Sequence, residues 1–162
     1  MITQEQLHRA IHYDPLTGEF TWKVQNGPCS KGKRAGRHND SGYWRITIDG
    51  VTYRAHRLAW LYMTGEWPID QIDHINGVKD DNRWINLRQA NNSQNHANKA
   101  RQKNNTSGFK GVSLDKRHQR WHAYIKKDNR RHFLGYFESR EEAHRAYILA
   151  AEEFFGEFAR TA

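Results

Sequence analysis

Hydrophobic and polar residues follow short, changing patterns along the first part of the chain. At 3–11 the apolar residues recur at helical spacing behind Thr3 and Gln6, a capping-box pair, so a short helix is expected. Residues 20–24 alternate between apolar and polar in strand fashion. The stretch 25–42 is polar and rich in Gly and basic residues, which is typical of a loop.

The clearest strand pattern occurs at 43–53, where apolar residues alternate around Asp49 and Gly50. An Asp-Gly pair flanked by such alternation is the strongest short-range signal for a β-hairpin. Residues 55–62 then recur at helical spacing and predict a helix that ends before Gly65.

A second set of patterns begins after 100–107, a polar stretch without apolar periodicity that we interpret as a linker. Three short β-type runs lie at 111–113, 121–125 and 132–137, and an amphipathic helix follows at 139–155. Together these elements predict a three-stranded antiparallel sheet packed on one helix, whose apolar stripe belongs to the core.

Composition indicates modest cores and an anionic partner. Apolar residues make up 36% of the chain and aromatic residues 12%, with a mean hydropathy of −1.03, so the chain is too aromatic for disorder and too polar for a deep core. Its 26 Lys and Arg exceed its 18 Asp and Glu, which gives a net charge of +8 and a pI near 9.7. This excess favours nucleic acid over membrane, and a basic surface kept only for solubility is the alternative.

The single Cys29 rules out an intramolecular disulfide and a multi-Cys zinc site. No stretch approaches the roughly 20 apolar residues that span a bilayer, and the first residues do not have the pattern of a signal peptide. We therefore expect a soluble, unsecreted protein without a membrane partner, and no obligate protein partner is evident.

Polar residues that can act on a phosphodiester are concentrated at 71–99. Asp73 and His74 lie in a short apolar strand, a polar loop follows, and residues 84–87 are expected to return the chain as a second strand. An Asn N-cap then begins a helix that carries Asn95 in its first or second turn. Phosphodiester hydrolysis needs a group that deprotonates water and groups that stabilise negative charge, and this stretch can supply both.

In this arrangement a carboxylate from the strand and an amide oxygen from the helix converge. Those are hard oxygen ligands, suited to Mg²⁺ or Mn²⁺ rather than to zinc. Asp80, Asp81 and Asn82 are assigned mainly to loop structure, because Asp and Asn side chains bond their own backbone. His56, at the start of the predicted 55–62 helix, is either a ligand or a packed, hydrogen-bonded residue, and its apolar helix favours the second interpretation.

Residues 43–98 resemble the HNH nuclease family, in the branch found in phage and mobile intron endonucleases. The matching segments are GYWRITIDG, AHRLAW, DHING, DNRWINLR and SQN. Residues 107–158 resemble an AP2 DNA-binding domain through SGFKGVS, RWHAYIK, FLGYF and EEAHRAYILAA. The resemblance implies an α+β fold, with a small ββα-metal (HNH) nuclease core and N-terminal β-hairpins, followed by a three-stranded antiparallel sheet plus one helix of AP2 type.

This interpretation divides the chain into four parts. They are a helix and strand extension at 1–42 that packs on or leads into the nuclease, an HNH nuclease domain at 43–99, the linker at 100–107 and an AP2-like domain at 108–162. Double-stranded DNA is the implied partner. If a phage encodes the protein, a cytoplasmic location in the bacterial host is implied.

Four site residues are carried over from the HNH motif. His74 matches the general base that activates water, and Asp73 matches a metal ligand, with Mg²⁺ or Mn²⁺ as the implied cofactor. Asn86 matches the middle Asn, implied to stabilise the loop and so orient His74. Asn95 matches the last position, where the phage and intron branch uses Asn as a metal ligand. His96 is the competing assignment, and Asn95 is favoured because adjacent helical residues point about 100° apart.

The AP2 resemblance implies DNA contacts from the exposed face of the sheet. The matching positions are Lys110, Ser113, Arg117, Trp121, Tyr124, Lys126 and Arg131. Core packing is the alternative for Trp121. Arg83 and Arg88, in the nuclease part, either clamp phosphate or pair with the nearby acids.

The sequence therefore predicts a metal-dependent DNA endonuclease of the homing type, which nicks DNA or cuts both strands. The alternative from another class is a non-catalytic, sequence-specific DNA-binding or regulatory protein with a degenerate HNH fold. An RNA-acting protein is a third interpretation, which rests only on the positive charge.

Overall fold

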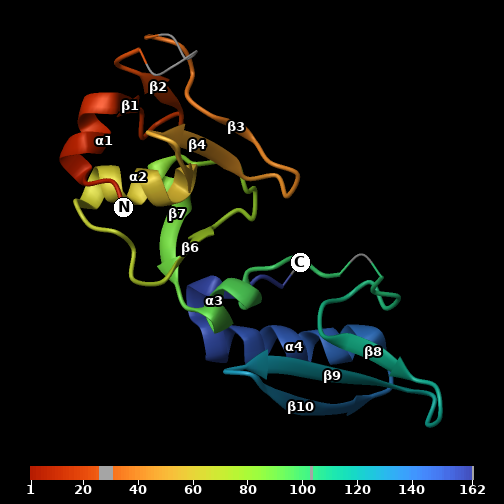
Figure 1. Cartoon of the computed structure of the whole chain (residues 1–162). Coiled ribbons are helices and arrows are strands. Elements are labelled where there is room, and N and C mark those ends of the chain that lie inside the picture. The colour runs from red at the N-terminus through yellow and green to blue at the C-terminus, as the bar shows by residue number, and fades with distance from the viewer. Residues whose placement is uncertain (26–30, 103, 162) are drawn as a thin grey trace. The chain divides into compact units, whose positions relative to one another are not determined.

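A computed structural model describes residues 1–25, 31–102 and 104–161. Helices and small sheets are mixed along the chain, which confirms the predicted α+β fold class. The chain forms two compact units, Met1–Gln89 and Ala90–Ala162 (Figure 1). This boundary precedes the predicted linker, and the four predicted domain limits stay predictions. Cys29 and the rest of 26–30, part of the predicted 25–42 loop, lie outside the described residues.

The described part of the first unit consists of short elements. In chain order they are α1 (Gln4–Ala10), β1 (Ile11–Tyr13), β2 (Phe20–Trp22), β3 (Arg37–His38), β4 (Trp44–Ile48), β5 (Val51–Arg54), α2 (Ala55–Thr64), β6 (Gln71–His74), a 3₁₀ turn (Trp84–Asn86) and β7 (Leu87–Ala90). β1 pairs with β2, β4 lies between β3 and β5, and β6 pairs with β7. The first unit therefore has small separate sheets arranged around its helices.

Local sequence signals produce the predicted structure at three points. Thr3 caps α1 and forms the capping box with Gln6. The β4–β5 hairpin turns at Asp49 and Gly50, and both have the positive φ that a two-residue type I′ turn requires. α2 ends at Gly65, whose φ of 84° is the left-handed cap conformation.

Two segments differ from the prediction. Within the expected 25–42 loop, β3 pairs with β4, although both β3 side chains are exposed. Because neither is buried, no apolar alternation marks this strand in the sequence. The expected strand at 84–87 is instead a 3₁₀ turn that leads into β7, and Trp84 packs against Trp60 of α2 with ring centroids 5.1 Å apart.

Helix α2 contributes to the core of the first unit. Its Leu58 and Leu61 belong to one buried cluster with Leu7 of α1 and Ile11 of β1. Burial of such apolar surface is the main favourable contribution to folding. The same helix carries a buried polar side chain, His56, which lies at the candidate site described below.

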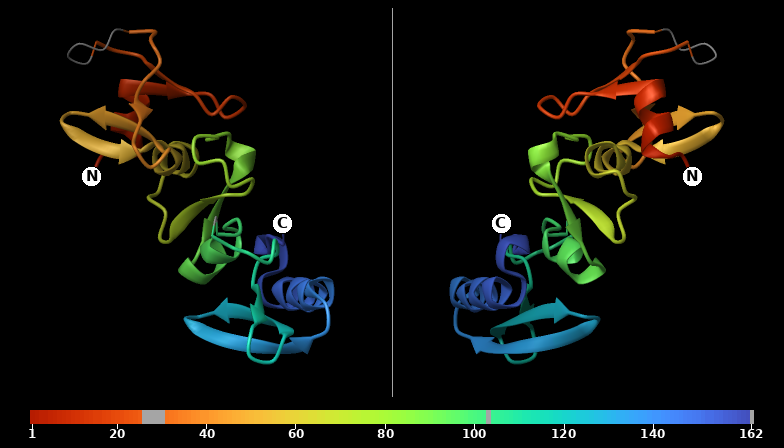
Figure 2. Two further views of the ribbon diagram at one scale, coloured as in Figure 1. Left: turned by 90° about the vertical axis from the view of Figure 1, so that its right-hand side faces the viewer. Right: turned by 90° about the vertical axis from the view of Figure 1, so that its left-hand side faces the viewer.

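In the second unit a short helix, α3 (Asn92–Ala97), precedes the sheet. Strands β8 (Val112–Asp115), β9 (Arg120–Lys127) and β10 (Arg130–Phe137) form an antiparallel sheet in the order β10-β9-β8, and α4 (Arg140–Phe155) lies along one face (Figure 2). A 3₁₀ turn follows at Gly156–Phe158. This arrangement confirms the predicted three-stranded sheet on one helix.

Buried residues recur along the face of α4 that meets the sheet. Tyr147, Ala151 and Phe155 belong to one apolar cluster with Ile125 of β9. The predicted apolar stripe therefore lies in the core. Among the described residues, no helix is long and apolar enough to cross a membrane.

Candidate functional site

Strand β6 carries Asp73 and His74, and each residue is only 5% exposed. Successive strand side chains point to opposite faces, so β6 is covered on both faces at this point. Ile75 is 43% exposed and lies just beyond β6. The buried part of the strand therefore ends at His74.

His74 is oriented by Asn82, a residue of the loop after β6. The side-chain oxygen of Asn82 lies 3.2 Å from Nε2 of His74, and its Nδ2 donates to the backbone oxygen of Asp80 at 3.1 Å. An amide oxygen only accepts hydrogen bonds, so Nε2 carries the proton and the lone pair of the neutral ring is on Nδ1. Burial lowers the pKa of His74, against the opposing effect of the Asn82 bond, and so favours the neutral ring.

His56 and Tyr43 pack near His74. The His56 ring meets the His74 ring edge-on, with centroids 5.0 Å apart, and Tyr43 lies 5.4 Å from His56. Within the described residues, Nδ1 of the buried His56 has no hydrogen-bond partner. Burial, and then the nearby His74, lower the pKa of His56 to about 3, so its ring is neutral. The structure thus shows a packed His56, but without the hydrogen bond at Nδ1 that a packed histidine usually makes.

Both arginines of the candidate site pair with acids. Nε of Arg88 donates to Oδ2 of Asp73 at 3.0 Å, and both side chains are largely buried. Arg83 donates to both carboxylate oxygens of Asp81, at 2.8 and 2.6 Å, and holds the pKa of that carboxyl at about 2. Acid pairing is therefore present for both arginines, and phosphate contact by them stays a prediction.

Asn86 ties the loop after β6 to the start of β7. Its side-chain oxygen accepts from the backbone N–H of Asn76 at 3.0 Å, and its Nδ2 donates to the backbone oxygen of Asp81 at 2.7 Å. Its own backbone oxygen accepts from Ile75 at 2.9 Å. Because Asn82 follows Asp81 directly, these bonds also restrain the residue that faces His74.

The N-terminal segments support the same loop from outside the predicted motif. The hydroxyl of Tyr13 donates to the backbone oxygen of Asn82 at 2.7 Å. The backbone N–H of Trp84 donates to the backbone oxygen of Pro15 at 2.9 Å. Gly18 has a φ of 75°, and a Cβ there would lie 2.5 Å from the carbonyl carbon of Asn82. Only glycine fits so close to this loop.

Asn95 and His96, the two candidates for the last ligand, both lie on α3. Asn91 is the N-cap of this helix and forms a capping box with Gln94. Asn95 belongs to the second unit and Asp73 to the first, so their convergence on one metal ion stays a prediction. His96 lines a hollow of the second unit, where Nζ of Lys99 lies 3.2 Å from its Nε2.

The sheet face opposite α4, here called the outer face, carries four of the seven predicted DNA contacts. Strand register places Ser113 opposite His122, and it places Lys126 opposite Arg131. The Arg131 guanidinium lies 3.8 Å from the centre of the Tyr124 ring, which puts both on one face. Ser113, Tyr124, Lys126 and Arg131 are therefore the predicted contacts on the outer face.

The other three predicted contacts have different surroundings. Arg117 lies in the exposed turn between β8 and β9, where its N–H donates to Asp115. Trp121 packs partly buried against the cluster of Val112 and Ala143, as in the core-packing alternative. Lys110 precedes β8, and its ammonium donates to backbone carbonyl oxygens within the second unit. DNA contact by these three residues stays a prediction.

Sequence reasoning missed several residues of both sites. Asn82 was assigned to loop structure, and nothing in the sequence marks it as the partner of a histidine. On the outer face, Phe133 is 50% and Tyr136 41% exposed, and their ring centroids lie 5.2 Å apart. Strand alternation could have found Phe133, which shares a face with Arg131, but Tyr136 reaches this face only through the irregular register between Phe133 and Gly135.

Comparison with known proteins identifies two regions. The HNH endonuclease family model matches residues 53–97, and the AP2 domain model matches residues 107–157. The chain is 34% identical over 121 residues to "Uncharacterized HNH endonuclease L560" of Acanthamoeba polyphaga mimivirus. The aligned residues are 74% of this chain and 62% of that protein. The chain therefore spans less than two thirds of this relative.

The chain is also similar to a phage protein and to a solved structure. "Protein 3.8" of Escherichia phage T7 is 33% identical over 110 residues, which are 66% of this chain and 88% of that protein. A solved structure, "DNA binding and cleavage by the HNH homing endonuclease I-HmuI", is 28% identical with a TM-score of 0.42, and the match covers 55% of this chain and 51% of that one. On the two family models, the chain carries an HNH endonuclease region at residues 53–97, followed by an AP2 domain at residues 107–157.

Proposed function

We propose that the protein is a metal-dependent endonuclease that hydrolyses phosphodiester bonds of double-stranded DNA, with His74 as the general base. The observation that supports this most is the bond between Asn82 and Nε2 of His74. It leaves a neutral imidazole whose lone pair, on Nδ1, can take the proton of an attacking water. A positioned imidazole is the commonest general base in enzymes.

The proton-accepting ring is held by its surroundings. Asn82 fixes the tautomer of His74, and the bonds of Asn86 to both ends of the preceding loop hold Asn82 in place. Burial lowers the pKa of His74, which keeps the ring able to accept a proton at neutral pH. In this proposal Asn82 and Asn86 are positioning residues and His74 alone touches the reacting water.

Asp73 and Asn95 would hold the divalent cation, Mg²⁺ or Mn²⁺. Their carboxylate and amide oxygens suit these hard ions, which usually take one or two carboxylates and keep several waters. Among the described residues, no three or more His, Cys, Asp and Glu side chains group as metal ligands, so the donor set is a small one. When bound, the cation supplies stabilisation of the negative charge on the phosphate and the leaving oxygen.

The AP2 domain would hold the DNA through its outer face. Lys126 and Arg131 supply positive charge there, and Tyr124 lies under the Arg131 guanidinium. Basic side chains position phosphates, and planar side chains contact base edges or sugars. The outer face therefore offers both kinds of contact that duplex binding requires.

Incubation of the full chain with supercoiled plasmid and Mg²⁺, followed by mapping of the new ends, tests this function. The wild-type protein should convert plasmid to the nicked or linear form, and the reaction should stop with EDTA. His74→Ala should lose cleavage while binding duplex DNA as tightly as the wild type. Cleavage at the wild-type rate by His74→Ala would overturn the assignment of the base.

A non-catalytic DNA-binding protein is the second candidate, because one observation favours it. The Asp73 carboxylate is already paired with the cationic Arg88, which takes the place of charge compensation by a metal ion. This candidate predicts DNA binding that is independent of Mg²⁺, with no nicking by the wild-type protein under any divalent cation.

A further inference from the structure

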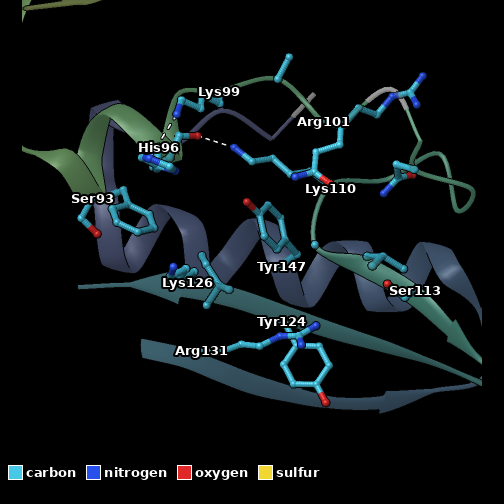
Figure 3. Close-up of a pocket in the computed structure, with 18 of the residues that line it drawn as sticks. Ser93, His96, Lys99, Arg101, Lys110, Ser113, Tyr124, Lys126, Arg131 and Tyr147 are labelled. Carbon is cyan, nitrogen blue, oxygen red and sulfur yellow. Dashed lines mark hydrogen bonds between the residues drawn. The ribbon is translucent and has the colours of Figure 1, made fainter. Parts of the chain in front are cut away.

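The second unit contains a hollow at the edge of its sheet, with a volume of about 1280 Å³ (Figure 3). Its walls come from α3 and the polar segment after it, from the start of β8, from β9 and from α4. This volume is far more than one phosphate or one metal ion fills. All its lining residues belong to the second unit, whereas His74 belongs to the first.

The hollow exists because β8 covers only part of β9. β8 pairs with β9 from Arg120 to Ala123, and the backbone bond from Tyr124 to Gly111 extends the pairing by one residue. Beyond that bond the edge of β9 faces the hollow instead of a strand. Gly111 has a φ of 72° and no room for a Cβ, which would lie 2.3 Å from the Tyr147 ring. The chain therefore turns tightly against α4 and leaves this edge open.

Positive charge dominates the lining. Among the residues that the structure describes, five cationic side chains and one carboxylate line the hollow, namely Lys99, Arg101, Lys110, Lys126 and Arg131, with Asp128. In the described part of the chain, none of the five forms an ion pair with a carboxylate. Uncompensated cations in a concave surface attract polyanions more strongly than the same charges on a flat surface.

The cations differ in how they are held. Lys110 is partly buried and donates to the backbone oxygens of Ala97 and Arg160, so it is a fixed charge at the wall. Arg131 is stacked on Tyr124, whereas Arg101 is exposed on the segment after α3. The lining thus combines charges held by protein contacts with charges on exposed side chains.

We propose that this hollow binds the backbone phosphates of a nucleic-acid strand, a proposal that rests on the proposed function and extends it. The hollow shares Ser113, Tyr124, Lys126 and Arg131 with the outer face. A strand held on the outer face therefore continues past the open edge of β9 towards Lys99 and Arg101. The segment that the sequence marks as a linker is then part of the DNA contact, and the several spaced cations match the spaced charges of a phosphodiester chain.

The salt dependence of binding tests the proposal. Fluorescence anisotropy with a labelled duplex oligonucleotide, in EDTA to prevent cleavage, gives the association constant of the full chain over a range of salt concentrations. Each phosphate contact adds about 0.9 to the slope of log K against log salt. Arg101→Gln should therefore lower the slope by about 0.9 and weaken binding about eightfold at 0.1 M salt, and adding Lys99→Gln should lower the slope by about 0.9 again.

Arg145→Gln is the matched control. Arg145 is an exposed residue of α4 in the same unit and does not line the hollow, so this variant loses one charge elsewhere. Its slope should stay at the wild-type value. If Arg101→Gln and the double variant behave like Arg145→Gln, the proposal is overturned. If instead the wild type does not bind duplex at all, it is the proposed function that fails.

A free anion is the other source of the same chemistry. Inorganic pyrophosphate, titrated into the wild type and the double variant by calorimetry, distinguishes it from a strand. We expect the wild type to bind pyrophosphate only weakly. In the double variant, the slope of log K against log salt for duplex binding should be clearly lower than in the wild type. Tight pyrophosphate binding that the double variant loses, with an unchanged duplex slope, would overturn the assignment to a strand.

Discussion

The side-chain oxygen of Asn82 faces Nε2 of His74 at 3.2 Å, and the amide is kept in that orientation by its second bond to Asp80. The pair connects a buried strand to the polar loop that follows it. It decides which ring nitrogen of His74 holds the proton, and hence which one can act on water.

Loss of this contact should slow cleavage without affecting DNA binding. In Asn82→Ala the imidazole of His74 can adopt either tautomer, so kcat should fall by about 10- to 100-fold, part of what a positioned base contributes. KM and the duplex affinity should stay at wild-type values. Plasmid cleavage under saturating DNA measures this, with the exposed neighbour substitution Asp80→Ala as control. Equal rates for the two variants would contradict the role given to Asn82.

Asn86 should contribute to stability more than its neighbour in the chain. Asn86→Ala removes the hydrogen bonds to the backbone groups of Asn76 and Asp81, and at about 0.5–1.5 kcal/mol for each bond the two together cost about 1–3 kcal/mol. Ile85→Ala is the matched control because Ile85 is 83% exposed, and its effect should stay within about 0.5 kcal/mol. Urea unfolding of both variants gives the comparison. A smaller effect at Asn86 than at Ile85 would show that these bonds do not hold the loop.

Two glycine substitutions separate backbone strain from close packing. Gly18 and Gly32 have φ values of 75° and 80°, but a Cβ at Gly18 would lie 2.4 Å from the Arg83 backbone nitrogen, whereas one at Gly32 would meet no atom of the described residues within 4 Å. Gly18→Ala should therefore lower the melting temperature more than Gly32→Ala does. It should also reduce cleavage, because the added methyl displaces the loop that carries Asn82. Equal melting temperatures would mean that the loop moves aside freely.

His56 should make the fold sensitive to acid. Its pKa is about 3 in the folded protein and near 6.5 in the unfolded chain, so below pH 6.5 the unfolded chain binds the extra proton. The free energy of unfolding should therefore fall as the pH drops from 6.5 towards 3, by up to about 1.4 kcal/mol per pH unit. His56→Phe keeps a ring and removes the titration. Urea unfolding at several pH values should give a shallower decline for this variant, and parallel curves would exclude His56 as the cause.

Mg²⁺ should stabilise the protein through Asp73. A ligand that binds only the folded state adds about 2.7 kcal/mol at one hundred times its dissociation constant. The melting temperature of the wild type should therefore rise with Mg²⁺, and that of Asp73→Asn should not. Asp40→Asn, at an exposed position, is the control and should respond as the wild type does. A wild-type response in Asp73→Asn would move the metal site elsewhere.

The parts of the fold that sequence predicted are those with local signals. The Asp49-Gly50 turn, the Thr3 capping box and the apolar stripe of α4 are each encoded within a few residues, and each is present as expected. β3 has no such signal, because both its side chains are exposed and only its backbone pairs. The 3₁₀ turn at 84–86 was likewise missed, since contacts of Trp84 with distant residues fix it.

The candidate site likewise contains residues with a signal in the sequence and residues without one. Asp73, His74 and Asn86 were predicted as site residues because their order and spacing match a known motif, and their roles stay predictions. Asn82 and His56 act on His74 only after the chain has folded, from 8 residues away in the first case and from another element in the second. Residue type and periodicity do not reveal such contacts. The sequence analysis therefore assigned Asn82 mainly to loop structure and favoured a packed, hydrogen-bonded role for His56.

The close approach of Gly18 to the loop at Asn82 and Arg83 limits how the nuclease part can be cut and exchanged. A fragment or chimera that begins at residue 43 would include every residue of the recognised motif. It would lack the Tyr13 hydroxyl, the Pro15 carbonyl and the turn at Gly18, against which that loop is built. A segment meant to fold and function in a chimera should therefore be longer than the motif and should begin at α1.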